Sequence, residues 1–301
     1  MSPVPELVES TAEEEDRMAG TANGSLSADQ AVHAVRAVTG PQDRAAAVTL
    51  AEVSKVYGRG PGAVHAVDRL SLTVGTGEFV CLVGASGCGK STLLSMVAGL
   101  DLPTAGTVDT GGRRVAIMFQ EPALFPWLTV QKNVELALRA RKVAAAERRS
   151  RTAGLLGAVH LADFAAKRPH ELSGGMRQRV ALARALAQDA DVLLMDEPFG
   201  ALDAMTRDLL HDELERIAAE RGLTVLFVTH NVREAARLGD RVVVLSSRPG
   251  RVIEEYLVPR TGPRRIDSVA VAELASKVTD RLRAEMRRHE PPGQSGRGAA
   301  S

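Results

Sequence analysis

A glycine-rich stretch from residue 84 to residue 92 has the residue types and spacing of a loop that binds phosphate groups. It matches the pattern G-x-x-x-x-G-K-[ST] and consists of Gly84, Ala85, Ser86, Gly87, Cys88, Gly89, Lys90, Ser91 and Thr92. Glycines let backbone N–H groups curl around phosphate oxygens, and a following helix adds positive potential. We therefore expect Lys90 to reach the β- and γ-phosphates of a nucleotide and Ser91 to hold Mg²⁺. The alternative is a plain glycine turn, which would not need the Lys-Ser-Thr triplet.

Two adjacent carboxylates follow the apolar run Val192–Met195. Such a run predicts a buried strand, and open parallel sheets build their sites at the carboxyl ends of their strands. We expect Asp196 to hold Mg²⁺ through water and Glu197 to orient and polarise the water that attacks the nucleotide. The alternative is that both carboxylates cap a helix, but Pro198 and the lack of an immediate helix argue against it.

A third motif is Leu172-Ser-Gly-Gly-Met-Arg-Gln-Arg179, which runs directly into a helical segment. Ser173 stands where a helix N-cap belongs, and Gly174 and Gly175 expose backbone N–H groups behind it. Taken alone, this motif is either a second anion site at a helix N-terminus or an ordinary capped helix.

Short apolar segments and helical segments alternate along the chain and would position these motifs. Strands are predicted at residues 47–57, 70–74, 78–84, 192–195, 223–230 and 242–247. The first of them alternates apolar and polar residues, as an edge strand does. Residues 130–188 are mostly helical by the same criteria. The alternation predicts an α/β fold with a mainly parallel sheet.

Composition excludes several classes of protein. The net charge of +1 argues against a general nucleic-acid binder, which would carry a basic excess. The two cysteines, Cys81 and Cys88, form neither a disulfide framework nor a zinc site, which favours a reducing cytoplasm. No apolar run approaches the ~20 residues of a membrane helix, and the acidic first residues do not have the pattern of a secretory signal. We therefore expect any membrane role to depend on a partner.

The motifs together resemble those of the ABC proteins, whose signature is LSGG followed here by Gln178 and Arg179. The resemblance covers about residues 48–258. It implies a phosphate-loop NTPase with a mainly parallel core, an antiparallel β subdomain and a helical subdomain at about 121–185. The ATPase domain would span 47–258. Composition predicts a flexible acidic extension before it at 1–46 and a disordered tail at the end of 259–301. An amphipathic helix is predicted in 259–301 by apolar residues at three- to five-residue steps: Ile266, Val271, Leu274, Val278, Leu282 and Met286.

The same resemblance implies roles for four further residues. Tyr57 is similar to the aromatic residue that stacks on adenine, although a plain strand tyrosine is a fair alternative. Gln120 is similar to the glutamine that contacts Mg²⁺ and links the helical subdomain to the core. Asp203, in Ala201-Leu-Asp203, would contact the opposite subunit, and His230 would contact the γ-phosphate.

In this family the site is divided between two subunits. The phosphate loop of one copy and the signature of the other, here Ser173, Gly174 and Gly175, would enclose one ATP with its Mg²⁺. The implied partner is therefore a second copy of the chain in an ATP-bound dimer. Several charged groups around one phosphate are what phosphoryl transfer requires.

Two stretches, 119–134 and 196–207, resemble the ATPases of nitrate, sulfonate and taurine importers, and residues 228–252 agree. The resemblance implies a subunit on the cytoplasmic side of the cell membrane that binds a permease and depends indirectly on an extracytoplasmic solute-binding protein. It favours aliphatic sulfonates as solute, with nitrate and taurine close behind. The alternative is a soluble ABC-type ATPase that acts on nucleic acid or ribosomes without a permease; we expect no nucleic-acid partner.

An apolar cluster at residues 124–128 includes Trp127, the only tryptophan of the chain. In the importer family this region helps to form the groove that receives the permease. The alternative is that it belongs to the hydrophobic core of the helical subdomain. The sequence leaves both open.

Overall fold

The computed structural model describes residues 44–258 and 265–289. Nearly all of the extension predicted at 1–46, residues 259–264 and the predicted tail from 290 onward lie outside the described residues. Within the described ranges, no helix has both the length and the apolar character needed to cross a membrane.

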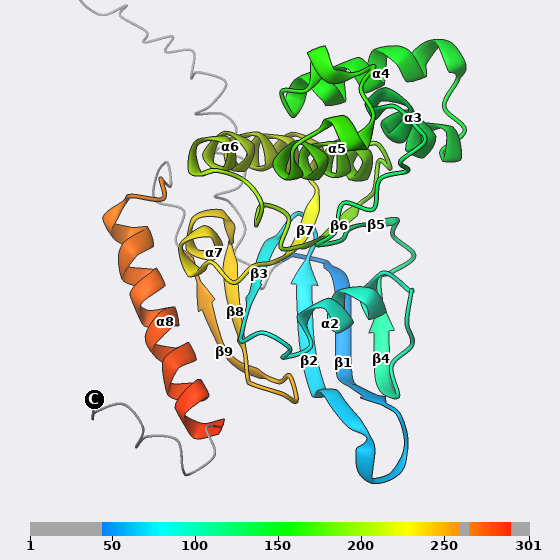
Figure 1. Ribbon diagram of the computed structural model, residues 1–301. Coiled ribbons are helices and arrows are strands. Elements are labelled where there is room, and N and C mark those ends of the chain that lie inside the picture. Colours follow the sequence, from blue (N-terminus) through cyan, green and yellow to red (C-terminus); the bar gives the residue numbers. More distant parts are fainter. Residues whose placement is uncertain (1–43, 259–264, 290–301) are drawn as a thin grey trace, which may run out of the picture.

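A six-stranded sheet forms the centre of the fold (Figure 1). Its order is β5-β6-β7-β3-β8-β9, and all strands are parallel except β9, which pairs antiparallel with β8. The strands are β3 Phe79–Val83, β5 Val115–Met118, β6 Val192–Asp196, β7 Thr224–Val228, β8 Arg241–Leu245 and β9 Val252–Leu257. The fold class predicted from the alternation of strands and helices is confirmed.

The parallel strands are apolar throughout because both faces of the sheet are covered. In β3, Phe79, Cys81 and Val83 pack into one buried cluster, whereas Val80 and Leu82 pack into the other. The first cluster includes the helices α3, α4, α5 and α6, and the second includes α2 and the smaller sheet. A strand with two buried faces therefore loses the apolar–polar alternation of a half-exposed strand.

A smaller antiparallel sheet covers one side of the core. It contains β1 Ala46–Tyr57, β2 Val64–Gly75 and β4 Ala105–Asp109 in the order β2-β1-β4. The prediction that residues 47–57 form an edge strand was wrong, because β1 pairs on both sides. Alternation reports one buried face and not the position in a sheet, and the mostly exposed strand β4 is too short and polar to be seen in the sequence.

Seven helices complete the described part of the chain (Figure 1). They are α2 Lys90–Val97, α3 Val130–Ala140, α4 Ala145–Ala158, α5 Gly174–Leu186, α6 Ala204–Arg221, α7 Val232–Leu238 and α8 Val269–His289. Three short 3₁₀ turns lie at Gly60–Gly62, Ala162–Phe164 and Pro169–Glu171. Helices α3, α4 and α5 gather at one end of the molecule, in the interval for which the sequence predicts a helical subdomain.

The last helix, α8, lies against α7 and β9 (Figure 1). Val271, Ala275 and Val278 are its buried apolar residues, and Arg281 bonds Glu254 of β9 at 2.7 Å. Of the apolar positions that predicted this helix, Ile266 precedes its first residue and Met286 is exposed. Leu274 and Leu282 are partly buried against the core, so the packed stripe runs from Val271 to Leu282 and is shorter at both ends than the sequence periodicity indicates.

Candidate active site

The glycine-rich loop connects β3 to α2, so its position is set by a buried central strand. Gly89 is the N-cap of α2 and has a left-handed conformation with φ of 96°. A Cβ atom at Gly89 would lie 2.6 Å from the carbonyl oxygen of Ala66, so only glycine fits. The helix therefore begins with its free N–H groups directed at the loop, as anion binding requires.

Lys90 is buried, and its Nζ donates hydrogen bonds to the carbonyl oxygens of Gly84 and Ala85, both at 2.9 Å. The ammonium group is thus held inside the curve of the loop by backbone acceptors. An anionic ligand in the loop would be a stronger acceptor than these carbonyls, because hydrogen bonds between charged groups are shorter and stronger.

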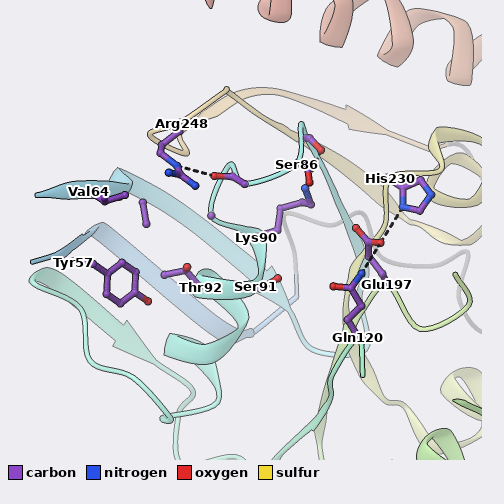
Figure 2. A pocket seen from close by; sticks show the side chains of 14 residues that line it. Tyr57, Val64, Ser86, Lys90, Ser91, Thr92, Gln120, Glu197, His230 and Arg248 are labelled. Atoms are coloured by element: carbon purple, nitrogen blue, oxygen red, sulfur yellow. Dashed lines mark hydrogen bonds and ion pairs between the residues drawn. The ribbon is translucent and has the colours of Figure 1, made fainter. Parts of the chain in front are cut away.

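Three of the predicted catalytic side chains meet at the carboxyl end of the sheet (Figure 2). Glu197 follows β6 directly, and its Oε2 lies 3.0 Å from Nδ1 of His230 and 3.5 Å from Nε2 of Gln120. Gln120 follows β5 and His230 follows β7, so three parallel strands deliver the group. His230 is 69% exposed and free to meet a ligand.

Asp196 ends β6 and is buried beside the loop. Burial raises the pKa of its carboxyl group above the usual value, a hydrogen bond with Ser91 opposes this shift, and the neighbouring Glu197 charge adds to it. The buried Asp196 carboxylate and the Ser91 hydroxyl beside it offer oxygen ligands to a cation. Such oxygen donors suit Mg²⁺, which also takes ligands from phosphate and water. No group of three or more His, Cys, Asp or Glu side chains in the described ranges could hold a metal ion by itself.

A cavity of about 550 Å³ joins the phosphate loop to Gln120, Glu197 and His230, whereas Asp196 lies behind Ser91 and does not line it. Figure 2 shows the side chains that face it. The lining residues are Tyr57, Val64, Ala66, Gly84, Ser86, Gly87, Gly89, Lys90, Ser91, Thr92, Gln120, Glu197, His230 and Arg248. Loop residues Ala85 and Cys88 do not line it. Cys88 is buried behind the loop, and burial raises the pKa of its thiol.

Tyr57 is the last residue of β1 and lines the end of the cavity away from Glu197 (Figure 2). Its hydroxyl donates a hydrogen bond to Asp101 at 2.9 Å, and Nζ of Lys55 lies 5.0 Å from the centre of its ring. The ring is therefore fixed at the cavity wall, 43% exposed, with room for a planar ligand to contact it.

The structure does not bring the signature residues to this cavity. Ser173 caps α5, and its Oγ accepts a hydrogen bond from the backbone of Met176 at 3.2 Å. Asp203 caps α6 in the same way, and hydrogen bonds from Thr206 lower the pKa of its carboxyl group. Gly174 and Gly175 start α5 beside Ala201 and Leu202, so the two motifs lie next to each other. Each motif is thus an accessible helix N-terminus outside the cavity of its own subunit.

Three lining residues were missed in the sequence: Val64, Ala66 and Arg248. Val64 and Ala66 belong to the antiparallel strand β2 and carry no chemical group that marks them. Arg248 follows the predicted strand at 242–247, whose carboxyl end lies at the same edge as those of β3 and β6. Its position after a predicted strand could have marked Arg248 as a site residue, because the carboxyl ends of parallel strands lie at the edge of the sheet where sites are built.

Known proteins show the same combination of motifs and fold. A family model described as ABC transporter matches residues 67–200. The nitrate import ATP-binding protein of Synechocystis sp. is 45% identical over 220 residues, which cover 71% of this chain and 83% of that protein. An aliphatic sulfonates import ATP-binding protein of Mesorhizobium japonicum is 48% identical over 221 residues, covering 72% and 82%.

A solved structure of similar fold is a dimeric ATP-binding cassette in a post-hydrolysis state, bound to ADP and Pi. It superposes with a TM-score of 0.66 at 35% identity, over 70% of this chain and 99% of that one. Sequence and fold therefore agree. The chain belongs to the ABC transporter family and is one of its ATP-binding, ATP-hydrolysing subunits of the import type.

Proposed function

We propose that this chain hydrolyses Mg-ATP in the cavity between the phosphate loop and Glu197, and that a second copy completes the site. The observation that carries the proposal is the meeting of Lys90, Glu197 and His230 at one cavity while Ser173 and Gly174 lie outside it. A nucleotide would lie with its adenine toward Tyr57 and its γ-phosphate toward Glu197.

Mg²⁺ would be held by the Ser91 hydroxyl and the Gln120 amide oxygen, and by the Asp196 carboxylate through water. When bound, the ion neutralises charge on the β- and γ-phosphates. The raised pKa of buried Asp196 supports this assignment, because a cation beside the carboxylate offsets the cost of burying its charge.

Glu197 would accept a hydrogen bond from the attacking water and orient it toward the γ-phosphate. His230 and Gln120 hold the carboxylate from two sides in the present arrangement. His230 is exposed enough to turn from Glu197 to the γ-phosphate when ATP binds. Lys90 would exchange its loop carbonyls for phosphate oxygens, which places a fixed positive charge where negative charge develops.

The second copy would bring Ser173, Gly174 and Gly175 to the open side of the cavity. Backbone N–H groups at the start of a helix suit an anion, and none of these three residues lines the cavity of its own subunit. The dimeric state of the similar cassette structure supports this arrangement. Asp203, next to the signature glycines across Leu202, would contact the same partner.

A permease would dock on the apolar surface formed by Phe119, Phe125, Trp127 and Leu136. Trp127 is 68% exposed and its ring lies 5.5 Å from that of Phe125. Phe119, Phe125 and Leu136 line a groove of about 660 Å³ beside Gln120. Of the two interpretations of Trp127, core and docking surface, exposure favours docking, because a core tryptophan would be buried.

Truncating Trp127 tests the docking surface. Trp127→Ala should weaken docking by about 2 kcal/mol, as loss of an aromatic interface anchor often does. Transport in proteoliposomes with the permease should fall, whereas the ATPase rate of the free subunit and its thermal midpoint should stay unchanged. Met286→Ala removes an exposed apolar side chain from α8 and serves as the control. A large drop in the midpoint for Trp127→Ala would instead assign the side chain to the core.

The solute we propose is a small oxyanion, with an aliphatic sulfonate first and nitrate or taurine next. The support is the similarity to import proteins named for these solutes; another relative is named for bicarbonate, also an oxyanion. The subunit would work on the cytoplasmic face of the membrane, bound to its permease. A solute-binding protein on the other face would act on the subunit indirectly, through the permease.

Reconstitution decides between this proposal and a soluble ATPase that acts on nucleic acid. The subunit should co-purify with a membrane permease, and a binding protein loaded with sulfonate should raise its ATPase rate severalfold. Unloaded binding protein is the control. Stimulation by DNA, RNA or ribosomes, without membrane association, would contradict the importer proposal.

A further inference from the structure

The turn that joins β8 to β9 is a rigid unit held by its own hydrogen bonds. The backbone N–H of Ser246 donates to the carbonyl of Arg251 at 2.9 Å, and Ser246 Oγ donates to the carbonyl of Pro249 at 2.7 Å. The N–H of Arg251 donates back to Ser246 Oγ at 2.9 Å. A short turn closed by three bonds holds its outermost residues in fixed positions.

This turn is bonded to strand β2, and its backbone also contacts the phosphate loop. The N–H of Gly250 donates to the carbonyl of Ala66 at 2.9 Å, and its carbonyl accepts from the N–H of Asp68 at 3.1 Å. A Cβ atom at Gly250 would lie 2.2 Å from the carbonyl oxygen of Cys88, so the two backbones are in close contact. Backbone contact at Gly250 therefore holds the turn close to the loop.

Arg248 lies on the side of this turn that faces the cavity (Figure 2). Its Nε donates to the carbonyl oxygen of Gly87 at 3.1 Å, which orients the guanidinium plane. The side chain is exposed, and no described residue accepts a hydrogen bond from its two terminal amino groups. A guanidinium with a free fork of donors is suited to phosphate oxygens.

The position of Arg248 indicates which phosphates it can reach. In Figure 2 it lies between Val64 and the loop, on the side of Tyr57, whereas Gln120, Glu197 and His230 lie at the opposite side of the cavity. Apart from Lys90, it is the only fixed cation among the described residues that line the cavity. A nucleotide extending from Tyr57 to Glu197 would pass Arg248 before its terminal phosphate.

We propose that Arg248 binds the α- and β-phosphates of the nucleotide and so sets its affinity without taking part in hydrolysis. The inference rests on the ATP site proposed above. Because ATP and ADP share these phosphates, both lose the same contact when Arg248 is replaced. The contact is made in the ground state and in the transition state alike, so its loss changes binding and leaves the rate at saturation unaffected.

Calorimetric titration with ATP and with ADP, both with Mg²⁺, tests the inference. Arg248→Gln should weaken both by about tenfold, the effect of one lost charge-assisted contact. Its maximal ATPase rate should stay within about twofold of the parental rate. Arg248→Lys, which keeps the charge, should recover part of the affinity. Arg149→Gln, a change of the same kind on the exposed face of α4, should have no effect.

Three results would overturn the proposal: unchanged affinity for both nucleotides in Arg248→Gln, a loss for ATP alone, or a lower thermal midpoint with no recovery in Arg248→Lys. The last would mean that Arg248 only braces Gly87. Lys90→Ala in the same assay separates this inference from the site itself. If Lys90→Ala removes nucleotide binding and Arg248→Gln does not weaken it, the site stands and Arg248 has no part in it.

Discussion

Glu197→Gln should lower the ATPase rate by about 10²–10⁴-fold, the usual effect of removing a general base. Glutamine keeps the shape of the side chain and can still bond Gln120 and His230, but its amide oxygen is far less basic than a carboxylate. ATP binding should therefore persist while hydrolysis stops. Phosphate release and nucleotide titration measure the two properties separately. Glu147→Gln, an exposed change on α4, is the matched control.

The Glu197→Gln variant also tests whether a second copy of the chain completes the site. With hydrolysis blocked, Mg-ATP should hold two subunits together, and light scattering should report a dimer. Adding Ser173→Arg should prevent the dimer, because a bulky side chain at the start of α5 would obstruct the phosphate of the opposite subunit. The new residue also loses the cap on Met176, worth about 1 kcal/mol, so the thermal midpoint is measured as well. A Glu197→Gln protein that stays monomeric at saturating ATP would contradict the divided site.

Lys90→Ala should reduce hydrolysis by about 10²–10³-fold or abolish nucleotide binding, because it removes the cation inside the phosphate loop. Two internal hydrogen bonds, to the carbonyls of Gly84 and Ala85, disappear with it. Gly84 lines the open cavity, where water can replace the lost donor, so the fold should be retained. Nucleotide titration, phosphate release and circular dichroism measure the three outcomes.

Lys132→Ala is the control for this change, since Lys132 is exposed on α3 and far from the loop in sequence. It should bind and hydrolyse ATP at the parental rate. If Lys90→Ala also kept the parental rate, the phosphate loop would not be the site of ATP hydrolysis.

The sequence predicted the elements of the core better than their arrangement. The apolar runs of β3, β6 and β7 are long enough to show that both faces are buried, so the parallel sheet could be predicted. The position of β1 could not. Its alternation shows that one face is buried, but β4, which makes it a central strand, is exposed and polar, and pairing depends on backbone hydrogen bonds that no residue pattern encodes.

The candidate site divides in the same way. The phosphate loop, the two carboxylates and the signature could be found from sequence motifs, because binding and hydrolysing a nucleotide needs fixed residue types at short spacing. The sequence did not show that Nε2 of Gln120 comes within 3.5 Å of Oε2 of Glu197, a residue 77 positions away. Nor did it show that the turn after β8 brings Arg248 to the phosphate loop. Those contacts follow from strand order and from backbone packing at Gly250.

The sequence by itself determined the α/β class, the ATP-binding family and the residues that carry its motifs. Tertiary structure decided which of them share one cavity, that Ser173 and Asp203 lie outside it, and that Trp127 is exposed. The reason is physical: local patterns record which residues a segment buries and which groups it offers, since these depend on nearest neighbours along the chain. Which groups meet depends on how distant segments pack, and that is settled only when the whole sheet and its helices are in place.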